Sequence, residues 1–237
     1  MQTGLPFASP RRAARLAGAL YVLIIILGAF AELVGRQSFV SAHDAAATAR
    51  AILMREGVYR WGFAAEMATN VIAVPASLIL WRLLAPVGRF WVLVALVLDL
   101  TQNAINAVNQ ATQYAPLTLL GGGRDLAAIP AGQLAALAQL ALRQHDIGFD
   151  IGLTFFGAAL LIYGAVIFRS RFLPAWLGLL YALAGGCYLV NSVDTFLALN
   201  LPIFPWILFG AFIGEAALAL WLLIFAVDEA KWRAAAA

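Results

Sequence analysis

The 237-residue sequence is 64% hydrophobic and only 11% charged, whereas soluble domains are near half apolar and about a quarter charged. So little polar surface cannot cover so apolar a chain in water, which excludes a soluble domain of any size and predicts an integral membrane protein. The formal net charge is +3, and the Arg and Lys side chains sit mostly at the ends of apolar runs. We interpret them as topology and headgroup contacts and predict no nucleic-acid binding.

Six apolar runs follow in chain order, each long enough for the roughly 20 residues of a membrane-spanning helix. Unpaired backbone groups are too costly in hydrocarbon, and no run alternates like a barrel strand, so the runs predict helices. The expected fold is an all-α membrane protein, a polytopic bundle of about six transmembrane helices. The predicted spans are Leu16–Val34, Trp61–Leu84, Phe90–Val108, Ile147–Phe168, Pro174–Leu199 and Pro205–Val227.

Two longer segments separate some of these spans. Ser41–Arg60 starts with a helix cap at Ser41 and continues with helical periodicity. Tyr114–Arg143 contains three successive glycines and then Pro130, which opens a second short helix. Both segments predict amphipathic helices that lie at the outer membrane interface.

The basic residues predict an orientation. With the N-terminus inside, nine cations fall in cytoplasmic segments and six in outer ones, so the positive-inside rule places both termini in the cytoplasm. We expect residues 1–15 to be a cytoplasmic N-terminal segment, 16–228 a single six-helix transmembrane domain and 229–237 a cytoplasmic tail, in the plasma (inner) membrane. A cleaved signal peptide is the alternative for the first helix, because its apolar run ends in the small-x-small residues 29–31.

Acidic residues inside the spans are the most informative feature. Each intramembrane carboxylate costs roughly 2.5–3.5 kcal/mol, so such residues usually serve a function. At about 1.5 Å per residue, all six helices place polar side chains between the bilayer middle and the non-cytoplasmic surface. We infer a polar, acid-rich cavity that opens toward this surface. The acids within or at the ends of spans are Glu32, Glu66, Asp99, Asp146, Asp150, Asp194 and Glu215.

Three of these acids, Glu66, Asp99 and Glu215, are the candidate catalytic residues. No Lys or Arg lies in the interior of a span, so the deeper acids can stay protonated and hydrogen-bonded, hold a cation, or face a substrate that becomes positive. Polar residues at helical spacing form stripes beside them. The simpler interpretation is that amides and protonated acids hold the helices together. The predicted substrate-binding residues are Asn70, Gln102, Asn103, Asn106, Asp150, Asn191 and Asp194.

No metal site and no cofactor is predicted. His145 with Asp146 and Asp150 could bind a divalent ion, but the sequence has only two histidines, and zinc sites usually need more nitrogen or sulfur ligands. The glycines at 121–123 lack the lysine and serine of a P-loop. The single cysteine, Cys187, excludes an intrachain disulfide.

Several stretches of the sequence carry a family resemblance. They are RRAARLAGALYVLIIILGAFAE near the start, then HDAAATARAIL, WGFAAE, FRSRFLPAWLGLLYALAG and GEAALALWLL. In these stretches the chain resembles a bacterial membrane family known as domain of unknown function 4386, from about Arg11 to about Val227. The resemblance implies a fold and a membrane location. It implies no activity, and no catalytic residues can be carried over from it.

Functions of different classes fit these residues. One is an acid-catalysed isomerase or cyclase acting on a lipophilic, isoprenoid-like substrate, with Asn103 and Asp194 orienting the reacting groups; its use of buried acids resembles the membrane-bound terpene cyclases by architecture alone. The alternative is a proton- or cation-coupled carrier, or a membrane protein that binds a small amphiphile. A third is a structural subunit that works beside a partner. The expected partners are the lipid bilayer and a lipophilic small molecule, and both oligomerisation and enzyme activity stay open.

Overall fold

The computed structural model describes residues 9–202 and 206–237, and this part of the chain is helical without a β-strand, which confirms the predicted all-α class. The predicted N-terminal segment therefore lies partly outside the described residues, as does Pro205 at the start of the last predicted span. The α-helices of the described residues are α1 Pro10–Ala29, α2 Ala45–Met54, α3 Glu56–Leu120, α4 Ala131–Arg169, α5 Ala175–Leu197, α6 Trp206–Ile224 and α7 Glu229–Ala236.

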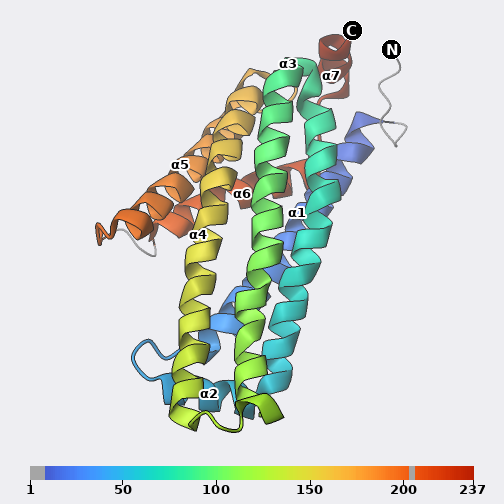
Figure 1. The fold of residues 1–237 in the computed structure, drawn as a ribbon. Coiled ribbons are helices and arrows are strands. Elements are labelled where there is room, and N and C mark those ends of the chain that lie inside the picture. The colour runs from blue at the N-terminus through green and yellow to red at the C-terminus, as the bar shows by residue number, and fades with distance from the viewer. Residues whose placement is uncertain (1–8, 203–205) are drawn as a thin grey trace. The chain divides into compact units, whose positions relative to one another are not determined.

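The helices give the predicted number of membrane crossings. Five helical stretches among the described residues are long and apolar enough to span a bilayer: α1 with its continuation to Phe39, then α3, α4, α5 and α6. The 65 residues of α3 correspond to a length of about 98 Å, which is enough for two crossings. The α3 backbone breaks at Gly88 (φ −173°, ψ 77°), and Figure 1 shows α3 turning back on itself there. The chain is a multi-pass membrane protein.

The break in α3 has a cause in the sequence. Pro86 lies two residues before Gly88. Proline lacks the N–H that an α-helix needs, and its ring clashes with the carbonyl group four residues earlier. Glycine adds a low helix propensity at the same place. The chain therefore reverses between two apolar arms, as expected between the predicted spans Trp61–Leu84 and Phe90–Val108.

The two predicted interfacial segments differ from the prediction in their boundaries. The N-cap of α2 is Asp44, whose Oδ1 accepts a 2.8 Å hydrogen bond from the Ala47 amide, and not Ser41. Asp44 occupies the position from which a side-chain oxygen reaches the amide three residues on. The short helix predicted after Pro130 is the first part of α4, which runs for 39 residues. Good helix formers, Ala, Leu and Gln, fill this stretch, so the helix continues into the predicted span.

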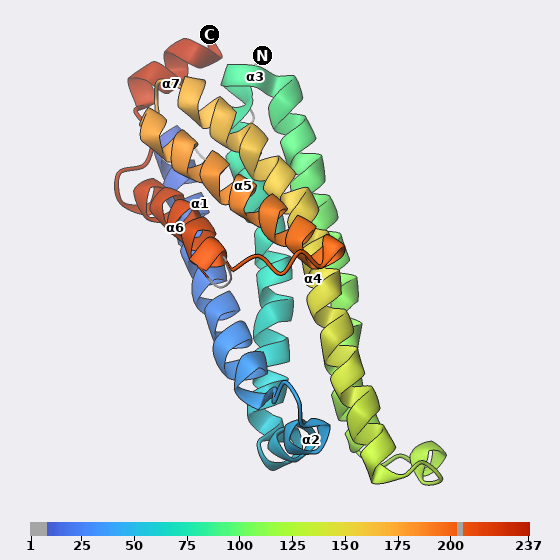
Figure 2. The same ribbon diagram turned by 90° about the vertical axis from the view of Figure 1, so that its left-hand side faces the viewer.

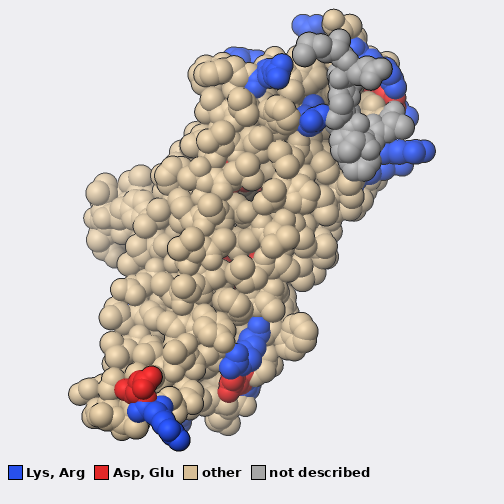
Figure 3. Space-filling view, turned by 45° about the vertical axis from the view of Figure 1, so that its right-hand side comes forward, with Lys and Arg blue, Asp and Glu red and all other residues tan. Residues whose placement is uncertain are grey.

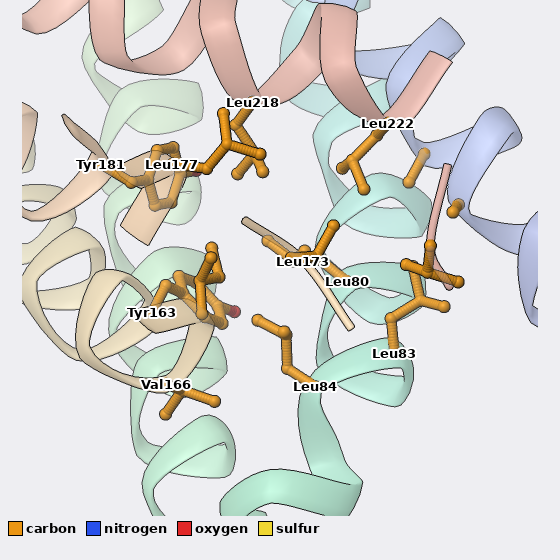
Figure 4. Close-up of a cluster of buried hydrophobic side chains, with 14 of the residues drawn as sticks. Leu80, Leu83, Leu84, Tyr163, Val166, Leu173, Leu177, Tyr181, Leu218 and Leu222 are labelled. Carbon is orange, nitrogen blue, oxygen red and sulfur yellow. The ribbon is translucent and has the colours of Figure 1, made fainter. Parts of the chain in front are cut away.

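The chain forms two compact units, and α3 and α4 each contribute to both. Unit one comprises residues 1–24, 72–103 and 150–237, and unit two comprises 25–71 and 104–149. The core of unit one is a cluster of buried apolar side chains from α1, α3, α4, α5, α6 and α7, part of which is drawn in Figure 4. In this view they converge from the surrounding helices: Leu80, Leu83, Leu84, Tyr163, Val166, Leu177, Tyr181, Leu218 and Leu222.

Unit two has a smaller core of its own. Its buried side chains are Phe39, Ile52, Tyr59, Leu117 and Leu142. The rings of Phe39 and Tyr59 meet edge to face with centroids 5.3 Å apart, a favourable geometry for aromatic pairs. Figure 2 shows the short α2 beside the first turns of α3, from which Ile52 and Tyr59 enter this core.

Large apolar side chains also cover the outside of the spans. Soluble proteins rarely expose broad apolar surface, whereas these side chains suit a lipid environment. In the space-filling view, tan surface covers most of the visible face of each unit, and acidic and basic side chains are few (Figure 3). Examples with more than half of the residue exposed are Ile26, Leu33, Val71, Val97, Val108, Leu179 and Phe209.

Candidate functional site

Glu215 of unit one lies against a tyrosine. The Tyr188 hydroxyl on α5 donates a hydrogen bond to Oε1 of Glu215 on α6. Gly214, the residue before Glu215, allows the close approach of the two helices, because a Cβ there would lie 2.9 Å from the Ala184 side chain. The small residue thus brings the carboxyl within reach of the hydroxyl.

Asp99 is the second buried acid of unit one, with 5% of the residue exposed. It lies on the second arm of α3 and forms a hydrogen bond with the Ser77 side chain on the first arm. Ser77 also forms a hydrogen bond with the hydroxyl of Tyr21 on α1. Three helical segments therefore meet around this carboxyl through neutral hydroxyl groups.

Asp150 and Asn191, both predicted to bind substrate, are direct partners in unit one. Nδ2 of Asn191 donates to Oδ1 of Asp150 at 2.9 Å, and Oγ1 of Thr195 donates to Oδ2 at 2.7 Å. Ser192 donates to the Asp150 carbonyl oxygen at 3.0 Å. Three side chains of α5 thus hold one residue of α4.

Asp194, predicted to be an orienting group, lies at the C-terminal end of α5. Its Oδ1 accepts a 3.0 Å hydrogen bond from the amide of Leu201, beyond the end of α5. Its carbonyl oxygen accepts from the amide of Ala198, which has left-handed backbone angles (φ 50°, ψ 44°). These contacts close the C-terminal end of α5.

In unit two, by contrast with the uncharged hydrogen-bond partners of Asp99 and Glu215, acidic and basic side chains form a charged cluster. Nε of Arg36 donates to Oε2 of Glu32 at 3.0 Å, and its Nη1 pairs with Asp146. Only 11% of the Arg36 side chain is exposed. Both Glu32 and Arg36 belong to a π-helical segment, Phe30–Arg36, a geometry that is often found at functional sites.

Glu66 belongs to the same unit and faces a histidine. Its Oε1 lies 4.0 Å from Nε2 of His145, whose side chain is 1% exposed. Nδ2 of Asn109 donates to the His145 carbonyl oxygen at 2.8 Å and fixes the position of that turn of α4. Nδ2 of Asn70 donates to the Glu66 carbonyl oxygen at 3.2 Å.

The predicted site residues are divided between the units. Asp99 and Glu215 share one property: no ion pair joins either of them to another described residue. Within the described ranges, no group of three or more His, Cys, Asp or Glu could hold a metal ion. Unit one contains Asp99, Gln102, Asn103, Asp150, Asn191, Asp194 and Glu215, and unit two contains Glu66, Asn70 and Asn106.

Comparison with known proteins gives a family. The model of the family described as "Domain of unknown function (DUF4386)" matches residues 16–226. The chain belongs to this family. It is also similar to an uncharacterized protein of Archaeoglobus fulgidus, with 32% identity over 75 residues, which are 32% of this chain and 44% of that protein. The chain thus spans less than half the length of this curated relative. No solved structure matches it.

All predicted site residues of this DUF4386 protein lie within the matched range. What sequence reasoning missed are mainly the pairings, which join these residues to Tyr188, Ser77, Thr195 and Arg36. The spacing of four residues between Glu32 and Arg36 was a usable signal, because side chains at this spacing meet on a helix. No sequence signal pairs Tyr188 with Glu215, since they lie on different helices.

Proposed function

We propose that this protein is a membrane-embedded enzyme that isomerises or cyclises a lipophilic, isoprenoid-like substrate by acid catalysis. The supporting observation is the pair of acids Asp99 and Glu215, each held by a neutral hydroxyl group and neither paired with a described cation. A carboxyl in this setting can give a proton to a substrate and take one back. A polar, acid-rich cavity in the non-cytoplasmic half of the bilayer is part of the proposal.

The proposed chemistry balances with these two groups alone. One carboxyl gives its proton to a carbon of a substrate double bond, which leaves a cation at the neighbouring carbon. The cation shifts or closes a ring and then returns a proton to the carboxylate that supplied the first one, so both carboxyl groups end the cycle in the protonation state in which they began it. Substrate and product have the same atoms, and no redox partner is needed. The apolar core beside Glu215 excludes water that would trap the cation.

A proton- or cation-coupled carrier is the second candidate function. The residues that support it lie in unit two. Glu66 lies 4.0 Å from His145, and an acid–histidine pair can bind and release a proton. Arg36 with Glu32 and Asp146 adds a charged network. Ionisable residues inside a membrane often mark ion pathways.

Native mass spectrometry with lipidomics tests the enzyme proposal. Wild-type protein in mild detergent should carry a specific lipophilic molecule, and Asp99→Asn/Glu215→Gln should lose it. Glu56→Gln, which changes an exposed acid outside the predicted site, is the matched control and should keep it. If wild type carries nothing specific, and Glu66→Gln abolishes proton flux in proteoliposomes, the carrier replaces the enzyme.

The proposed location is the bacterial inner membrane with both termini in the cytoplasm. Six crossings put both termini on one side, and the excess of cations in the inner segments favours the cytoplasm. Labelling of single cysteines in intact cells tests this orientation. In a Cys187→Ala background, an impermeant maleimide should label Arg124→Cys and not Ala237→Cys; the reverse pattern contradicts the proposal.

A further inference from the structure

A basic groove lies at the end of unit one where α5 and α7 begin. Its volume is about 390 Å³, within the range of roughly 300–1,000 Å³ found for small-molecule pockets. Arg11, Arg171 and Lys231 line it together with Trp221 and Phe225. Figure 3 shows Lys and Arg side chains gathered at the end of the surface that carries α7.

The walls of the groove are fixed by the backbone. The amide of Asp228 donates a 3.1 Å hydrogen bond to the carbonyl oxygen of Phe172, which ties the turn before α7 to the turn before α5. Arg171 (φ 57°) and Ala226 (φ 61°) both have left-handed backbone angles. Such angles are uncommon for residues other than glycine, and they persist where the surrounding structure holds them. The shape of the groove is therefore fixed by the folded backbone around it.

The charges in the groove are only partly balanced. Nζ of Lys231 pairs with Asp228 at 3.1 Å. The guanidinium groups of Arg11 and Arg171 form no side-chain hydrogen bond or ion pair with another residue of the described ranges. Three cations and one acid leave the lining with a net charge of +2. An anion can therefore meet two guanidinium groups that have no partner among the described residues.

The aromatic side chains indicate that the groove lies at the depth of the membrane–water interface. The ring centroids of Trp221 and Phe225 are 4.5 Å apart, and those of Trp176 and Trp221 are 5.7 Å apart. These rings lie at the start of α5 and the end of α6. Aromatic residues at span ends occupy the membrane–water interface. The groove thus combines cations, an interfacial depth and an apolar wall.

We propose that this groove binds the headgroup of an anionic phospholipid. Arg11 and Arg171 hold the phosphate, because the planar guanidinium group can donate two parallel hydrogen bonds to phosphate oxygens. Trp221 and Phe225 contact the glycerol and the first acyl carbons. The groove does not include Asp99 or Glu215. The test of this lipid site is therefore independent of the proposed enzyme activity.

Native mass spectrometry with added lipid tests the site. The purified protein is titrated with phosphatidylglycerol, with phosphatidylcholine of the same acyl chains, and with soluble glycerol phosphate. Wild type should bind phosphatidylglycerol most tightly and should be stabilised by it more than by phosphatidylcholine. Arg11→Gln/Arg171→Gln should weaken phosphatidylglycerol binding at least about 25-fold, because each substitution removes the charge-assisted hydrogen bonds of one guanidinium group to the phosphate.

The matched control is Arg12→Gln/Arg169→Gln. It removes the same charge from the start of α1 and the end of α4, and neither residue lines the groove. Its affinity should change less than about twofold. Equal losses in the two double variants would show general attraction to anionic lipid and overturn the site. Wild type that binds phosphatidylcholine equally well, or glycerol phosphate without lipid, would overturn it too, and these readouts need no variant.

Discussion

The Tyr188 hydroxyl group donates a hydrogen bond to Glu215, and this bond joins α5 to α6 within unit one. A buried carboxyl that loses its donor carries the full cost of desolvation. Tyr163 provides the opposite case, because its hydroxyl group is buried and has no hydrogen-bond partner among the described residues. The two tyrosines of unit one therefore differ in what their hydroxyl groups contribute.

Replacement of each tyrosine by phenylalanine should separate these cases. Tyr188→Phe should lower the free energy of unfolding by about 1–3 kcal/mol, since it leaves the carboxyl without its donor. Tyr163→Phe removes an unsatisfied hydroxyl and should be neutral or slightly stabilising. Denaturant unfolding in detergent measures both. If Tyr163→Phe is as destabilising as Tyr188→Phe, the hydrogen bond is not the source of the effect.

Gly164 marks the close contact between α4 and α5. A Cβ added there would lie 2.6 Å from the Gly178 carbonyl oxygen and 2.6 Å from the Ala182 amide nitrogen, both backbone atoms. Gly164→Ala should therefore push the helices apart and cost about 1–3 kcal/mol. Gly186→Ala is the control on α5, because nothing lies within 4 Å of its added Cβ. Equal melting temperatures for the two variants would contradict the close packing.

The sequence predicts the fold well because lipid restricts the choices. Apolar length alone identifies the spans, and the turn near Gly88 follows from Pro86 and the flanking arginines. The continuous α4 was not predicted. Pro130 and the charged residues near Arg143 resembled a boundary, yet they sit at the start of α4 and on its surface, where they do not break it.

The candidate site was predictable in its residue types and not in its pairings. Helical spacing shows that Asn191 and Thr195 share a face, and the structure gives both the same partner, Asp150. Which helix supplies the partner depends on tertiary packing. The spacing of residues within one helix does not reveal that packing. The pairing of Arg36 with Asp146 was missed for the same reason, because Asp146 lies on another helix, α4.

Arg36 and Asp146 should be energetically coupled. Arg36→Gln should cost about 1–3 kcal/mol because it leaves Glu32 and Asp146 without their cation. Asp146→Asn alone should cost less than about 1 kcal/mol, since 56% of that side chain is exposed.

A double-mutant cycle measures the coupling, which should be at least about 0.5 kcal/mol. The exposed pair of Arg60 and Glu56, 2.7 Å apart, is the control and should couple more weakly. Additive effects of Arg36→Gln and Asp146→Asn would show that the contact contributes nothing.

Asp228 should make the docking of α7 depend on pH. Hydrogen bonds from the backbone amide and the side chain of Lys231 hold the pKa of Asp228 below its ordinary value of 3.8. Because the folded pKa is the lower one, the ionised cap stabilises α7 above the unfolded pKa. This stabilisation is lost as the pH falls through the folded pKa. The indole of Trp232 donates a 2.8 Å hydrogen bond to the Leu83 carbonyl oxygen, so loss of the cap also loosens this anchor.

Hydrogen exchange of the α7 amides, corrected for intrinsic rates, measures this docking. In the wild type, protection should be level above the unfolded pKa and should fall as the pH drops through the lower folded pKa. Asp228→Asn keeps a capping oxygen that does not titrate, so its protection should stay level over the same range. Glu229→Gln tests the neighbouring carboxyl, which pairs with Arg233 at 2.7 Å, and should retain the wild-type pH dependence. A fall that persists in Asp228→Asn would assign the titration to another group.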